Sequence, residues 1–69
     1  MKINKLELQA ELKRNNYYYR TIAPKLGITH RTFFNKINGK YDFTVDEVKK
    51  LMKLLNLSEQ KVMDIFFNV

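Results

Sequence analysis

The sequence predicts a compact all-α domain of five short helices, and three observations support this prediction. Apolar residues recur at helical spacing on both sides of Gly27 and again after Thr44. Glycines and helix-capping side chains separate these apolar stretches. The 69 residues include no cysteine, so the 45% hydrophobic content must build the core without disulfides or thiolate metal sites. We expect residues 1–69 to form one domain.

The first helix is expected over Lys5–Arg14, where an Asn-Asn pair follows the last apolar residue. The second helix leads to Leu26, and its start depends on Pro24. A proline in the helix interior removes one hydrogen bond and kinks the helix. If Thr21 is the N-cap instead, Pro24 falls in the first turn, where proline is tolerated.

A tight turn is expected at Gly27, which can adopt the positive φ of a helix C-cap. Thr29, two residues later, is suited to cap the next helix. That third helix should run from His30 to about Asn38, where Gly39 stops it. Two short helices joined by such a turn can cross closely.

The last two helices have their own start signals. Thr44 and Glu47 form a capping box, in which each side chain accepts from the other residue's backbone amide. The apolar residues that follow at helical spacing are Val48, Leu51, Met52 and Leu55. Ser58 can cap a fifth helix, whose shared apolar face consists of Val62, Ile65 and Phe66.

Positive charge is concentrated in one part of the chain. The net charge is +6, but residues 1–40 carry nine basic and two acidic residues, whereas residues 41–69 carry four basic and five acidic ones. Residues 13–40 hold seven basic residues and no acid. A single lysine often serves only solubility, but a block of one sign favours an anionic partner, with nucleic acid the leading candidate.

Several classes of protein do not fit the sequence. No apolar run approaches the roughly 20 residues of a membrane span, and no signal-peptide pattern opens the chain. We therefore expect a cytoplasmic protein, associated with the nucleoid of a bacterial host. The one histidine, without cysteine, glycine-rich phosphate loop or suitable carboxylate pair, gives no basis for catalysis. No enzyme activity, metal or cofactor is expected.

The chain resembles the lambda-repressor-like and Cro-like helix-turn-helix domains of phage and bacterial transcription regulators. The matching residues are Ile22, Ala23, Leu26, Gly27, Ile28, Thr29, Phe33 and Asn38-Gly39-Lys40. The resemblance implies a Cro- or repressor-type regulator in which the second and third helices form the helix-turn-helix. Residues 29–38 would then read the major groove of operator double-stranded DNA.

Some positions depart from the family pattern. A frequent Arg–Glu pair corresponds here to Leu12 and Ile37, and we expect these two side chains to touch, since replacing both members of a buried pair is tolerated. Lys36 stands where the family is usually apolar, and Phe34 where it is usually polar. The buried face of the third helix should therefore be rotated slightly.

Four residues are predicted to contact bases: His30, Arg31, Phe34 and Asn35. An arginine can meet guanine bidentately, an asparagine matches adenine, and a phenylalanine suits the thymine methyl. Arg31 and Asn35 lie one turn apart, so both can project from one face. The alternative is that they are ordinary solvated side chains.

Phosphate contacts are predicted around the same helix, from side chains and from backbone amides near Gly39. The residues are Tyr19, Arg20, Thr29, Thr32, Lys36, Gly39 and Lys40. If about five or six phosphates are neutralised, binding falls by roughly 0.9 log units per contact for each decade of salt.

The C-terminal residues Met63, Phe67 and Val69 are apolar but lie off the predicted core face. They can cover the side of a small core, or form a patch for a homodimer or a partner repressor protein. A dimer suits a palindromic operator. A hetero-partner would instead indicate a modulator or antirepressor that acts mainly by binding another repressor.

Overall fold

The computed structural model describes residues 3–67, and these form five α-helices without a β-strand. The predicted all-α class is confirmed. In chain order the helices are α1 (Lys5–Arg14), α2 (Tyr19–Lys25), α3 (His30–Ile37), α4 (Val45–Leu54) and α5 (Glu59–Phe66). None of the helices in this described part is long and apolar enough to cross a membrane.

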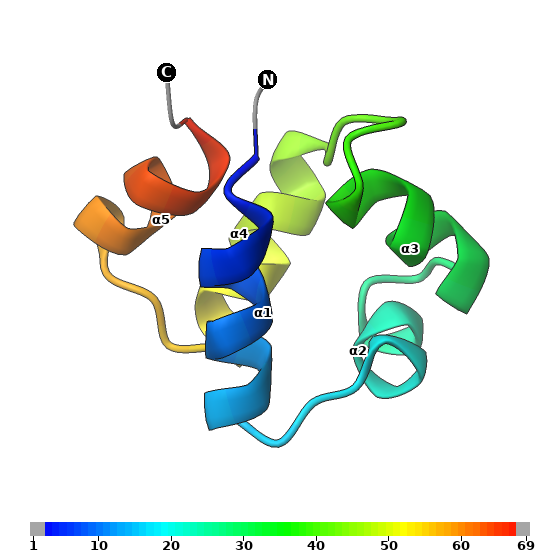
Figure 1. Cartoon of the computed structure of the whole chain (residues 1–69). Helices are drawn as coiled ribbons and strands as arrows, with labels where there is room; N and C mark the ends of the chain where they lie inside the picture. The colour runs from blue at the N-terminus through cyan, green and yellow to red at the C-terminus, as the bar shows by residue number, and fades with distance from the viewer. Residues whose placement is uncertain (1–2, 68–69) are drawn as a thin grey trace.

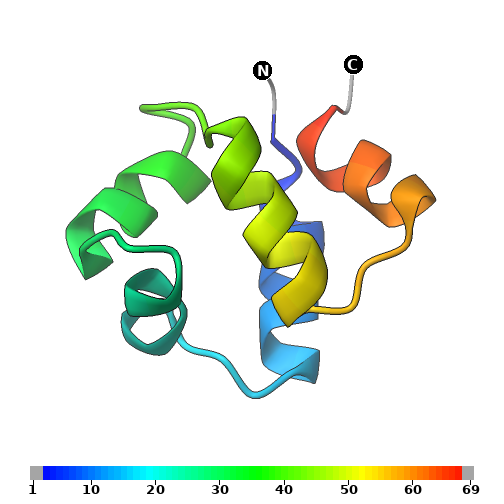
Figure 2. The same cartoon turned by 180° about the vertical axis from the view of Figure 1, so that it is seen from behind.

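The helices are arranged around α1 and α4, which lie one behind the other at the centre (Figures 1 and 2). α5 lies on one side of this central pair, and α2 and α3 lie together on the other. The close packing of α2 against α3 across a short turn is consistent with a helix-turn-helix. The fold therefore presents α3 at one edge of the molecule.

One apolar core receives side chains from all five helices and from the loop before α4. The rings of Phe33, Phe43 and Phe66 form a chain of edge-to-face contacts, with centroids 5.6 and 5.7 Å apart. Leu12 and Ile37, which were predicted to touch, are both buried in this core. Two apolar residues thus fill positions where the resemblance leads us to look for an ion pair.

Within residues 3–67, the helices α1 to α4 end in the same way. In each, a residue with positive φ follows the helix, and the next residue's N–H donates to a carbonyl five residues earlier, which is the Schellman motif. The residues with positive φ are Asn16, Gly27, Gly39 and Asn56. The bonds run from Tyr17 to Leu12, Ile28 to Ala23, Lys40 to Asn35 and Leu57 to Met52, at 2.8 to 3.1 Å.

The start of α2 resolves the two alternatives for Pro24. Tyr18 is the N-cap, and the Thr21 hydroxyl accepts a 2.8 Å hydrogen bond from its backbone amide. The alternative in which Thr21 itself caps the helix is wrong, because Thr21 lies within the first turn. Pro24 lies inside α2, one residue before its end, so the missing N–H leaves only the carbonyl of the exposed Arg20 without its helical donor.

A buried ion pair joins α3 to the start of α4. The Lys36 ammonium lies 2.5 Å from Glu47 Oε1, and the two side chains are 11% and 9% exposed. The same carboxylate oxygen accepts the Thr44 backbone amide at 2.9 Å, and Glu47's own amide donates to the Thr44 hydroxyl at 3.1 Å. The predicted capping box is confirmed, and it also holds the charge that neutralises Lys36.

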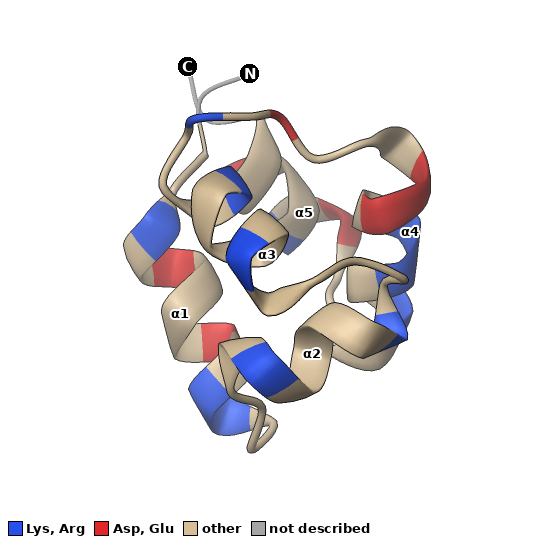
Figure 3. Ribbon diagram, turned by 90° about the vertical axis from the view of Figure 1, so that its right-hand side faces the viewer, with Lys and Arg blue, Asp and Glu red and all other residues tan. Residues whose placement is uncertain are grey.

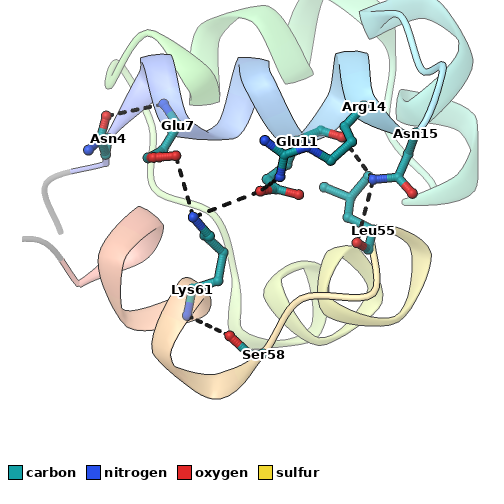
Figure 4. Close-up of polar contacts among 8 residues, drawn as sticks. All are labelled: Asn4, Glu7, Glu11, Arg14, Asn15, Leu55, Ser58 and Lys61. Carbon is teal, nitrogen blue, oxygen red and sulfur yellow. Dashed lines mark hydrogen bonds and ion pairs between the residues drawn. The ribbon is translucent and has the colours of Figure 1, made fainter.

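Separate ion pairs join α5 to α1 (Figure 4). Lys61 extends from α5 between two carboxylates of α1, 3.5 Å from Glu7 and 3.9 Å from Glu11. Arg14 contacts Glu11 at 2.6 Å. The backbone N–H of Asn4 also donates to the backbone carbonyl of Ile65 at 2.7 Å. Both acids in the N-terminal half are thus engaged at the α1–α5 contact.

The Lys36–Glu47 pair predicts an asymmetric mutational response. Glu47→Gln keeps an acceptor for the capping box but leaves a buried ammonium without its counter-charge, so we expect a loss of about 2–3 kcal/mol in the free energy of unfolding. Lys36→Met combined with Glu47→Gln should recover most of this loss. Urea denaturation of the two variants checks the prediction, and equal stabilities would contradict it.

The helix-end motif predicts a ranking of substitutions at Gly27. A methyl group on Gly27 would meet no atom within 4 Å beyond the adjacent residues of the chain. The cost of Gly27→Ala is therefore that of its backbone conformation, φ +76°. We expect about 1 kcal/mol, which lowers Tm by roughly 4–8 °C in a domain of this size. Gly27→Asn should cost less than half as much, because asparagine occupies the equivalent position after α1 and α4. Thermal denaturation gives the ranking, and an equal loss for both variants would count against it.

Candidate nucleic-acid interface

The site is built on α3, whose two sides have different environments. Thr29 caps its start by accepting the Thr32 amide at 3.1 Å. Phe33 and Ile37 are fully buried and fix one side of α3 in the core. Arg31 and half-buried Asn35 lie on the opposite side, and the exposed His30 and Phe34 lie between them and the buried side. We call these four residues, which are the ones predicted to contact bases, the outer face of α3.

A shallow depression on the outer face is lined by His30, Arg31 and Phe34. Phe34 is 51% exposed. Phe34 and Arg31 thus line the same hollow. The depression offers both an apolar surface and a cationic donor.

Tyr19 supports this face from α2. Its ring centroid lies 5.2 Å from that of Phe33, 6.3 Å from His30 and 6.4 Å from Phe34. Its hydroxyl accepts a 2.8 Å hydrogen bond from the Gln9 amide of α1. Tyr19 was predicted only as a phosphate contact, and no residue pattern indicates that Gln9 would hold it. The hydroxyl proton remains available to a further acceptor.

The predicted phosphate contacts divide into two groups. Arg20, Thr29 and Lys40 are exposed, and Thr32 is half-buried beside them. The Thr29 hydroxyl donates to that of Thr32 at 2.9 Å, which leaves the Thr32 proton free to donate outward. These residues, with Tyr19, surround the outer face and can still reach an anion.

Two of the predicted phosphate contacts have donors that are occupied within the protein. The Lys36 ammonium is paired with Glu47 in a nearly buried site, so it has no free charge to offer a phosphate. The Gly39 amide already donates to the Lys36 carbonyl at 3.1 Å in the Schellman motif. The Lys40 amide likewise donates to Asn35, so only its ammonium is available. A sequence pattern alone does not reveal that these donors are occupied.

The end of α3 differs from the other Schellman ends in the character of its side chains. The motif is commonly accompanied by an apolar contact between the two residues that its long bond joins. The pairs after α1, α2 and α4 are apolar or aromatic: Leu12 with Tyr17, Ala23 with Ile28, and Met52 with Leu57. After α3 the pair is Asn35 with Lys40. Polar groups therefore replace the usual apolar contact where the outer face ends.

Basic residues predominate on the two helices that carry the site, since neither α2 nor α3 contains an Asp or Glu. Figure 3 views the side of the molecule where α2 and α3 lie in front, with basic segments on both. The acids of α1 are engaged by Arg14 and Lys61 at the α5 side. Lys5 bridges the start of α1 to the end of α3 by donating to Asn38 Oδ1 at 2.5 Å. The outer face thus lies among the basic residues of α2 and α3, while the start of α4 brings acidic residues to one edge of this side (Figure 3).

The predicted C-terminal patch is only partly described. Met63 and Phe67 lie one turn apart at the end of α5 and are 52% and 46% exposed. Val69 lies outside the described residues. Two half-exposed side chains cover little of the core, and they leave a small apolar surface distant in sequence from α3.

Residues 3–67 contain no group of three or more His, Cys, Asp or Glu side chains that could hold a metal ion.

Comparison with known proteins gives a family match. The model of a family described as "Protein of unknown function (DUF739)" matches residues 4–69. A search of curated proteins found no significant match.

Proposed function

The chain belongs to the DUF739 family of proteins of unknown function, and we propose that it is a sequence-specific double-stranded DNA-binding regulator of transcription. The proposal rests mainly on one observation. α3 is held in the core by one side while its opposite side exposes residues suited to base edges. The resemblance to lambda-repressor-like and Cro-like domains supports the same function.

The chemistry of the outer face matches the major groove of DNA. The groove is about 12 Å wide and admits an α-helix. Arg31 can donate two hydrogen bonds to guanine O6 and N7, and Asn35 can pair with adenine N6 and N7. Because these two side chains lie one turn apart, they can address neighbouring base pairs from one helix.

Flanking groups would fix the helix on the duplex. Arg20 and Tyr19 lie at the start of α2, Thr32 lies beside the outer face, and Lys40 follows α3. Such contacts to phosphates set orientation without reading sequence. Lys36 and Gly39 take no part in this proposal, because their donors are occupied within the protein.

The alternative function is that of a modulator or antirepressor that binds another repressor. Its specific support is the exposure of Met63 and Phe67 on α5. The same two side chains could form part of a homodimer contact that spaces two α3 helices about 34 Å apart on a palindromic operator. DNA binding is the preferred function, because the basic residues of α2 and α3 and the polar outer face have no role in the alternative.

A binding selection from random DNA duplexes tests the proposal. We expect one motif to be enriched, and Arg31→Ala to weaken binding to that motif about tenfold or more while removing the preference for guanine at one position. Asn35→Ala should remove a preference for adenine. Lys53→Ala, an exposed charge at the end of α4, is the matched control. Failure to enrich any motif, or an unchanged motif for Arg31→Ala, would overturn this assignment.

Lys40 should behave differently, because a phosphate contact carries no sequence information. We expect Lys40→Ala to weaken binding to the enriched motif and to a scrambled duplex by the same factor. The slope of log affinity against log salt should become shallower by about 0.9. Titrations at several salt concentrations, again compared with Lys53→Ala, measure both quantities. An unchanged slope would exclude Lys40 from the phosphate contacts.

A further inference from the structure

We propose that Arg31 and Phe34 form one composite site that reads a thymine beside a guanine, and that Tyr19 is the positioning residue for this site. The inference rests on the proposed function and adds to it the chemical class of the base pair that is read. It depends on the joint geometry of three side chains rather than on separate base contacts.

The first argument comes from the depression that Arg31 and Phe34 share with His30. Residues three apart on a helix have Cβ atoms about 5–6 Å from each other, whereas stacked base pairs repeat every 3.4 Å or so. When Arg31 faces one base pair, Phe34 therefore faces its neighbour or the one beyond. The two side chains cannot address widely separated positions.

The second argument concerns what the exposed ring can bind. Donors and acceptors dominate the major-groove edges of the bases, and the thymine 5-methyl is the group that offers an apolar contact. An aromatic ring at this position cannot satisfy the hydrogen-bonding groups of an adenine or guanine edge. A methyl group in the depression would instead cover apolar surface that is exposed to water in the free protein.

The third argument concerns rigidity. Phe34 is half-exposed, but its ring packs at 6.4 Å from Tyr19, which is itself fixed by Phe33 in the core and by the Gln9 hydrogen bond. His30 packs against the same tyrosine. Less side-chain freedom is therefore lost when Phe34 meets a base than for an unsupported surface residue.

Replacing thymine by uracil in the duplex recovered from the binding selection tests the inference, because this change removes one methyl and preserves base pairing. Within two base pairs of the guanine assigned to Arg31, we expect one such replacement to weaken wild-type binding about fourfold, as for one buried carbon. Phe34→Ala should bind the thymine and uracil duplexes equally. Leu6→Ala, which removes an exposed apolar side chain from α1, should retain the full difference.

Variants of Tyr19 separate positioning from stability. Tyr19→Phe keeps the ring but loses the Gln9 bond and the proposed phosphate contact of the hydroxyl, so it should weaken binding to both duplexes and retain most of the preference for thymine. Tyr19→Ala should lose that preference even under conditions where circular dichroism shows the variant to be folded. The ratio of the two affinities is the readout, because a general loss of stability lowers both affinities together.

The outcomes distinguish the inference from the function on which it rests. If a motif is enriched but no uracil replacement weakens wild-type binding, the composite site is wrong while DNA reading stands. The same conclusion follows if Phe34→Ala keeps the thymine preference. If Tyr19→Ala keeps it, Tyr19 has no positioning role. If no motif is enriched, the proposed function and this inference both fail.

Discussion

The placement of α3 depends on the buried pair between Lys36 and Glu47. A lysine on this side of the helix would otherwise bring an uncompensated charge into the protein, at a cost that favours rotating α3 away from the core. Glu47 neutralises that charge, and the same carboxylate accepts the Thr44 amide in the capping box of α4. One side chain therefore fixes both the start of α4 and the orientation of α3. The polar side of α3 then faces outward as a consequence.

Much of the fold follows from local signals that can be seen in the sequence. The bounds of α1 agree with the prediction, and the caps at Thr29, Thr44 and Ser58 are confirmed. These caps could be predicted because each depends on residues within one turn. The start of α2 was harder to predict, since Tyr18 is an unusual cap and Thr21 competes for that role.

The site was less predictable because its details depend on contacts between distant residues. Lys36 resembles any solvated lysine until Glu47, eleven positions later, is placed beside it. Gln9 acquires its role only when α1 brings it to Tyr19. The backbone N–H of Gly39 was assigned to phosphate because backbone bonds at a helix end are not visible in a residue pattern. Exposure of Arg31 and Phe34, in contrast, follows from the helical position of Phe33 and Ile37.

The closed helix ends have a consequence for how the chain reaches its fold. In four helices, carbonyl groups of the last turn accept hydrogen bonds from amides no more than five residues later. In four helices, the N-cap side chain accepts a hydrogen bond from the amide three residues later. Each helix can therefore satisfy most of its backbone before tertiary contacts form. Helical domains dominated by such local contacts fold in microseconds to milliseconds, so a newly made chain should acquire its structure soon after synthesis.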